Sequence, residues 1–331
     1  MSPGPASGAA VLPETFAGAP KSPATAFRRP LRHRVADFAM SVATGSATAL
    51  VLVILGVILV DVIAHGAPTL SLGFLAQAPR AGMTAGGIFP AIFGTVALVI
   101  LMTIIVVPVG VATAIYLNEY APPRALLTRA MRAAISNLAG VPSIVFGLFG
   151  LGFFVQFVGT GIDKLAYGGQ KVFGQPALVW AALTLAILTL PVVIVATEEA
   201  LRGIPSETRA ASLALGATKF QTILHVVVPE AIPGILTGTI LAVSRGAGEV
   251  APILFTGAAY FLPTLPHRLH DQFMELGYHV FVMSTQSPDV DATKPILYAT
   301  VLVLLALTFL LNASAVLVRA RMRRKLSSAN A

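Results

Sequence analysis

The stretch EEALRGIPSETRAASLALGATKFQTILHVVVPEAIPG, residues Glu198–Gly234, is a short polar interruption between two long apolar runs. Residues Ala210–Leu215 favour a helix, because alanine and leucine have the highest helix propensities. Gly216 then permits a sharp change of direction, and a second amphipathic run, Phe220–Val228, is closed by Pro229. We predict two short helices that meet at a glycine, a shape that fits a groove on another protein. An ordinary helix-turn-helix loop is the alternative.

The composition around this stretch is that of an integral membrane protein. The chain has 331 residues, of which 56% are hydrophobic and only 11% charged, and its mean hydropathy is +0.84. Soluble domains carry about a quarter charged residues. Cysteine is absent, so disulfides and thiolate metal sites are excluded.

The apolar runs predict an all-α membrane protein with six transmembrane helices, since about 20 apolar residues cross a bilayer. The first run is too long for a signal peptide and is read as a retained helix. The expected spans are Phe38–Ile63, Ile88–Leu117, Ile135–Val158, Ala177–Thr197, Ile232–Ala258 and Pro295–Val318.

Three parts follow from this pattern: a disordered tail over residues 1–36, a permease domain over 37–318 that contains the loop 198–234, and a basic tail over 319–331 that meets anionic lipid. The Lys and Arg residues orient the set. With the N-terminus inside, 16 of the 22 fall on inner segments, five on outer segments, and Arg245 within a span. The positive-inside rule therefore predicts that both termini and the loop are cytoplasmic, and it accounts for the net charge of +8 without nucleic acid.

The fifth expected span contains two charged residues, Arg245 and Glu249. On a helix, residues four apart share one face. Charges inside a membrane are costly and mark pairs or water-filled pathways. We expect Arg245 to bind an oxyanion in a substrate pathway and Glu249 to hold it between transport events. A static ion pair that fixes helix packing is the alternative. Gly246 and Gly248 are expected to permit the close approach of a neighbouring helix.

The 198–234 stretch resembles the EAA coupling loop of ABC importer permeases, in which Glu-Ala-Ala is followed by a glycine and an apolar-Leu-Pro end. Gly216 and Pro229 match this pattern, and Ala210 stands where the family has its glutamate. The resemblance implies the type I ABC importer permease fold. It also implies that the ATPase is contacted by Ala210, Ala211, Ser212, Gly216, Ala217, Lys219 and Pro229.

Two further stretches, Arg245–Pro266 and Ser136–Phe154, together with the outer segment Met274–Pro288, resemble the PstA-type permease of the phosphate-specific ABC importer. This resemblance implies a heterodimer with a PstC-type sister permease, a PstB-type ATPase dimer, and a periplasmic phosphate-binding protein. It places the chain in a bacterial inner membrane, with inorganic phosphate as substrate. ATP and magnesium would bind the partner ATPase, so no cofactor is expected in this chain, which is not itself an enzyme.

Several alternatives stay open. The substrate could be another oxyanion such as sulfate, molybdate or phosphonate, or the chain could be a gradient-driven secondary transporter. His267 and His270 have helical spacing but lack a third metal ligand. No Walker motif or HExxH motif is present. Glu198 and Glu199 are read as interfacial charges or as a gate contact. The outer segment Leu269–Gln286 is read as an interfacial helix or a plain loop.

Overall fold

The computed structural model describes residues 31–287 and 289–329, almost all of them helical or in turns. The chain up to Val57 is one unit, which in the described part is the beginning of α1, and the chain from Ile58 onward is a second unit. The elements in order are α1 (Leu31–Gly66), η1 (Ala67–Thr69), α2 (Leu72–Ala76), β1 (Pro79–Arg80), η2 (Ala81–Met83), β2 (Ala85–Gly86), α3 (Phe89–Ile115), η3 (Tyr116–Tyr120), α4 (Leu126–Leu138), α5 (Ser143–Phe149), η4 (Gly150–Gly159), α6 (Thr160–Ala166), α7 (Leu178–Arg202), α8 (Ser206–Ala214), α9 (Lys219–Thr222), η5 (Ile223–Val227), α10 (Val228–Gly246), α11 (Leu276–Thr285) and α12 (Val290–Ala329).

The six expected membrane spans are confirmed in number. Within the described residues, six helices are long and apolar enough to cross a bilayer: Ala36–Thr69, Phe89–Tyr120, Ser143–Ala166, Leu178–Arg202, Lys219–Gly246 and Val290–Met322. The first and sixth contain the expected runs and extend beyond them, and the second and fourth begin one residue later than expected and end later. The third and fifth differ by more than a few residues, and both differences have a local cause.

The third expected span was placed too early. Residues near Ile135 belong to α4, which ends at Leu138, and the membrane helix begins only at Ser143. Pro142 explains the break, because the residue before a proline is pushed out of the helical region. α4 is thus a separate amphipathic helix.

The fifth expected span, Ile232–Ala258, was wrong at both ends. The helix begins at Lys219 and ends at Gly246, and residues 247–257 form a series of turns. Gly246, Gly248 and Pro252 lie at this end, and glycine and proline both disfavour helix continuation. Arg245 therefore lies in the last turn of α10, one residue before its end.

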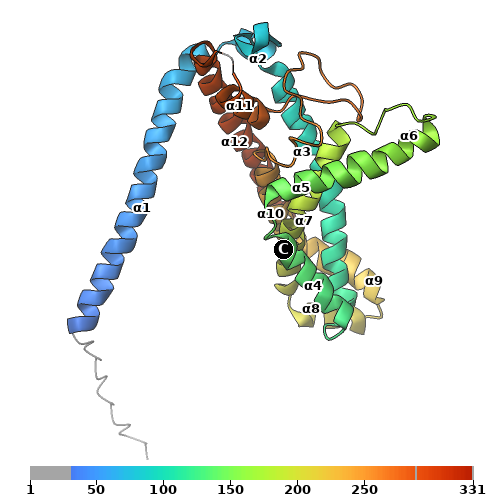
Figure 1. Cartoon of the computed structure of the whole chain (residues 1–331). Helices are drawn as coiled ribbons and strands as arrows, with labels where there is room; N and C mark the ends of the chain where they lie inside the picture. Colours follow the sequence, from blue (N-terminus) through green and yellow to red (C-terminus); the bar gives the residue numbers. More distant parts are fainter. Residues whose placement is uncertain (1–30, 288, 330–331) are drawn as a thin grey trace, which may run out of the picture. The chain divides into compact units, whose positions relative to one another are not determined.

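The core of the second unit is formed by α3, α7 and α10, which pack side by side (Figure 1). α7 is the central helix: two thirds of its most apolar window is buried. Its small residues Ala181, Ala182 and Ala186 are buried in the same cluster as Met102 of α3 and Ala242 of α10. Lipid is as apolar as a protein core, so helices in a bilayer associate through close packing, which small side chains allow.

The segment between α10 and α12 forms a shorter helix than expected, and it is packed within the protein. α11 contacts α3 and α12, and its residues Leu276, His279 and Met283 are buried. The expected short helix is therefore confirmed over Leu276–Thr285 and the plain-loop alternative is wrong, whereas the interfacial position of the helix stays a prediction.

The two expected tails lie partly outside the described residues. Residues 1–30 are not described, whereas residues 31–36, expected in the tail, form the first turns of α1. At the other end, α12 continues through the basic stretch to Ala329.

Candidate functional site

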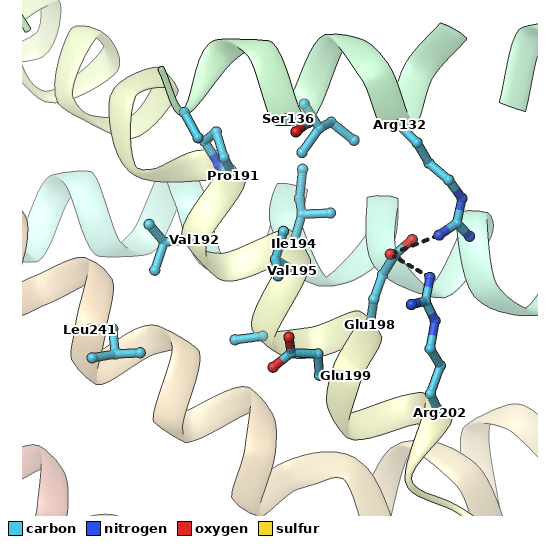
Figure 2. A pocket seen from close by; sticks show the side chains of 13 residues that line it. Arg132, Ser136, Pro191, Val192, Ile194, Val195, Glu198, Glu199, Arg202 and Leu241 are labelled. Carbon is cyan, nitrogen blue, oxygen red and sulfur yellow. Dashed lines mark hydrogen bonds and ion pairs between the residues drawn. The ribbon is translucent and has the colours of Figure 1, made fainter. Parts of the chain in front are cut away.

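A cleft of about 600 Å³ opens between three helices near the end of α7 (Figure 2). α4 contributes Arg132 and Ser136, α7 contributes its last three turns, and α10 contributes Leu241. Most of the wall is apolar, with charged groups gathered at one end. A mostly apolar cleft with a few gathered polar groups is typical of small-molecule binding sites.

The charged end of the cleft is organised by Glu198. Its Oε2 accepts a hydrogen bond from Arg132 Nη1 at 3.0 Å and another from Arg202 Nη2 at 3.1 Å, as Figure 2 shows. The Glu198 side chain is only 11% exposed. Arg132 also donates from Nη2 to the carbonyl oxygen of Leu117 at 2.9 Å. Because Glu198 is buried and bonded to two arginines, it belongs to a structural ion-pair network and is not an ordinary interfacial charge. Glu199, in contrast, is exposed.

Among the described residues, Glu198 Oε1 is buried and has no hydrogen-bond partner. Leaving a buried carboxylate oxygen without a partner costs free energy. The two hydrogen bonds that the arginines donate to the other oxygen must therefore offset this cost. Two guanidinium groups on one carboxylate leave a local excess of positive charge, and the neighbouring Glu199 also lines the cleft.

Arg245 does not line the cleft, and Leu241 is the residue that α10 contributes to it. Leu241 and Arg245 are four residues apart, so they lie on one face of the helix, and both are exposed. Arg245 Nε lies 3.4 Å from Glu249 Oε1. The expected pair therefore exists, but the expected shared helix face does not, because Glu249 follows the end of the helix and reaches Arg245 through a turn. The side chains are 41% and 19% exposed respectively.

The two glycines beside Arg245 have different surroundings. A Cβ added to Gly246 would lie 2.5 Å from Met102 Sδ of α3, and one added to Gly248 would meet nothing within 4 Å. The close helix approach expected at both positions is confirmed at Gly246 and wrong at Gly248. Gly246 thus brings the backbone next to Arg245 into contact with α3.

The coupling segment, residues 206–229, has the predicted geometry of two helices that meet at a glycine. α8 ends at Ala214, and Gly216 has a φ of 87°, in the left-handed region that glycine adopts at little cost. Thr218 then caps α9 in a capping box with Gln221. Ser212 Oγ lies 2.9 Å from Thr222 Oγ1 and joins the two arms.

The remaining expected contact residues have mixed positions. Ala210, Ala211 and Lys219 are exposed, and Ala217 is half-buried. Pro229 does not close the second arm as expected, because the helix continues past it to Gly246. The π-helical turn Ile223–Val227 ends two residues before Pro229, and such turns accommodate a local change in backbone pairing.

Sequence reasoning missed Arg132, which lies 66 positions before Glu198 and has no local signal. The Glu198–Arg202 pair did have a local sequence signal, since opposite charges four residues apart on a helix attract each other. His267 and His270 do not belong to a cluster of three or more His, Cys, Asp or Glu residues that could hold a metal ion, since no such cluster occurs within the described part of the chain.

Six helices long enough to cross a membrane, an arginine at the end of the fifth of them and an exposed two-helix segment between the fourth and fifth point to a membrane transport subunit. The chain belongs to the family described as "Binding-protein-dependent transport system inner membrane component", which matches residues 106–324. It is thus a multi-pass permease with the type I ABC importer fold.

Relatives support this assignment. The chain is 33% identical over 244 residues to the probable ABC transporter permease protein YqgI of Bacillus subtilis, an alignment that covers 70% of this chain and 78% of that protein. It is 41% identical over 170 residues to the phosphate transport system permease protein PstA 1 of Mycobacterium tuberculosis, covering 51% of each chain. The chain therefore spans about half the length of that mycobacterial relative.

Among solved structures, a bacterial alginate ABC transporter aligns with a TM-score of 0.62 at 13% identity, covering 87% of this chain and 96% of that one. An identity this low supports the fold alone.

Proposed function

We propose that this chain is one permease subunit of an ATP-driven importer of inorganic phosphate. The chain contributes half of the translocation pathway and one ATPase docking segment. Relatives named as phosphate permeases support the substrate, although the alignment with the mycobacterial one covers about half its length.

The observation that carries the substrate class is the state of Arg245. Only its Nε contacts Glu249, and among the described residues neither terminal nitrogen has a hydrogen-bond partner. These two donors lie in a fixed planar fork, which matches two oxygens of a phosphate. The exposed side chain gives the anion access. Glu249 then balances the charge of Arg245 when the pathway is empty.

The proposed assembly follows from the family. Both chain termini and the coupling segment lie on the cytoplasmic side, as the distribution of Lys and Arg favours. A PstC-type sister permease completes the pathway, a PstB-type ATPase dimer binds ATP and magnesium, and a periplasmic binding protein delivers phosphate. Nucleotide binding closes the ATPase dimer, and the two permeases rock between outward-facing and inward-facing states.

The cleft beside Glu198 is then the part of the pathway nearest the coupling segment. It shares the exposed face of α10 with Arg245, and its walls are mostly apolar. The two arginines of the cleft, Arg132 and Arg202, are engaged by Glu198, and the apolar remainder of the wall offers phosphate no hydrogen bonds, which favours release.

The test is phosphate uptake by proteoliposomes that contain the whole complex, with Arg245→Gln, Glu249→Gln and the exposed control Arg268→Gln at equal abundance. We expect Arg245→Gln to lose uptake and Arg268→Gln to retain it. Normal uptake in both pathway variants would contradict the proposed role. If sulfate, molybdate or phosphonate inhibited the uptake of labelled phosphate more strongly than unlabelled phosphate does, the substrate would be reassigned to that anion. Uptake in the absence of the ATPase would indicate a gradient-driven carrier.

A further inference from the structure

Both arms of the coupling segment contact the same turn at the end of α3. Arg209 of α8 donates from Nη2 to Glu119 Oε1 at 2.9 Å. Lys219, at the start of α9, places its Nζ 5.0 Å from the ring centre of Tyr120, within the range of a cation–π contact. Glu119 and Tyr120 belong to η3, a π-helical turn. Such turns are rare and are frequently found at functional sites.

Arg209 is largely buried and donates several hydrogen bonds at once. Its Nη1 donates to the carbonyl oxygen of Ile204 at 2.7 Å, and its Nη2 also donates to that of Leu201 at 2.8 Å. The side chains of Arg209 and Glu119 are 22% and 9% exposed. Arg209 thus ties three parts together: the coupling segment, the end of α7 and the end of α3. A lysine lacks the planar fork that makes these bonds simultaneously.

α3 differs from its neighbours in how it is attached to the coupling segment. α7 and α10 continue into that segment through the chain, whereas α3 has a separate connection to α4. Movement of the segment therefore reaches α7 and α10 through the backbone and reaches α3 through side chains.

Further along, α3 contacts the segment that holds Arg245. Met102 is fully buried and lies against Gly246, the residue after Arg245. A continuous path of packed groups therefore runs from Arg209 through Glu119 and α3 to the neighbour of the pathway arginine.

We propose that Glu119 and Arg209 form a joint that makes α3 move with the coupling segment, so that ATPase closure repositions the wall around Arg245. They are positioning residues and contact no substrate. This inference rests on the proposed function for its transport readout, but the joint itself is testable without phosphate.

The first arm of the test measures the joint directly. The chain has no cysteine, so nitroxide labels are placed at Ile104→Cys on the exposed face of α3 and at Glu207→Cys in the first turn of α8. The distance between them is measured by pulsed electron paramagnetic resonance in the whole complex, nucleotide-free and trapped with ATP and vanadate. We expect a narrow distribution that is the same in both states. In Glu119→Gln we expect it to broaden or shift on trapping. An unchanged narrow distribution in Glu119→Gln would overturn the joint.

The second arm measures phosphate transported per ATP hydrolysed. We expect Glu119→Gln and Arg209→Lys to keep ATP hydrolysis while this ratio falls roughly tenfold, as for the loss of one charge-assisted hydrogen bond. Glu230→Gln and Arg129→Gln, both exposed, should leave it unchanged. An unchanged ratio in Glu119→Gln would contradict the joint. If the wild-type complex moves no phosphate, the proposed substrate fails, and the distance measurement still decides the joint. If the Arg209→Lys complex no longer binds the ATPase, the result for Glu119→Gln decides whether the joint exists, because Glu119 lies outside the coupling segment.

Discussion

Arg132 of α4 and Glu198 of α7 meet at 3.0 Å, 66 positions apart in the chain. This pair connects the amphipathic helix α4 to the central helix α7 beside the cleft. It also brings Arg132 close enough to η3 to bind the carbonyl oxygen of Leu117. A single buried carboxylate therefore holds three elements at one end of the helix bundle.

Replacing Glu198 by Ala should destabilise the protein, because two arginines lose their acceptor and one of them is partly buried. The expected loss is about 1–3 kcal/mol, less than for a fully buried pair since Arg202 is more than half exposed. Thermal unfolding of the purified complex measures it. The adjacent exposed Glu199→Ala is the matched control, and an equal loss in both variants would refute the structural role of Glu198.

Adding one methyl group should distinguish the two glycines beside Arg245. Gly246→Ala places its Cβ 2.5 Å from Met102 Sδ, and overpacking of this kind costs about 1–3 kcal/mol. Gly248→Ala meets open space and should be nearly neutral. Unfolding midpoints and phosphate uptake are compared at equal abundance. Equal behaviour of the two variants would show that α3 does not contact α10 at Gly246.

The turn of the coupling segment should tolerate only residues that accept a positive φ. Gly216→Val adds a β-branched side chain at a φ of 87° and should strain the turn by about 1–2 kcal/mol. Gly216→Asn should be close to wild type, since asparagine enters the left-handed region more readily. The measurement is co-purification with the ATPase. Weak binding by the Asn variant alone would contradict a backbone cause.

The pH dependence of stability should reveal the raised pKa of Glu275. Burial raises the pKa of this carboxyl group from 4.5 to about 7, against the hydrogen bonds from Gly277, Tyr278 and Thr95 that favour its charged form. Between pH 4.5 and 7 the unfolded chain releases this proton while the folded protein retains it, so stability falls as pH rises through this window. Glu275→Gln should remove this slope in thermal unfolding measured from pH 4 to 8.

His279, one turn later, should give the opposite slope. Burial lowers the pKa of its imidazole from 6.5 to about 4. Between pH 6.5 and 4 the unfolded chain takes up a proton that the folded protein excludes, so stability falls as pH drops through this window. The two slopes partly cancel in the wild type. Glu275→Gln should therefore unmask the His279 slope, and a flat profile in that variant would contradict the neutral buried imidazole.

Much of the fold could be predicted from the chain because its determinants are local. Helix number follows from runs of apolar residues, and the bend at Gly216 follows from one residue that accepts a positive φ. The Arg245–Glu249 pair was also predictable, since the two residues are only four apart. The breaks at Pro142 and after Gly246 were missed, although proline and glycine signalled both, because apolar composition alone continues through them.

The sequence by itself determined that this is a six-helix membrane protein with two short helices that meet at Gly216 and with a charged pair four residues apart, Arg245 and Glu249. Hydropathy and backbone preferences act within a few residues, so they can be read along the chain. Only the tertiary structure decided that Arg132 binds Glu198, that Arg209 binds Glu119, and that Met102 lies against Gly246. These contacts join residues 66, 90 and 144 positions apart, and they depend on how α3, α4, α7, α8 and α10 pack, which no local pattern specifies.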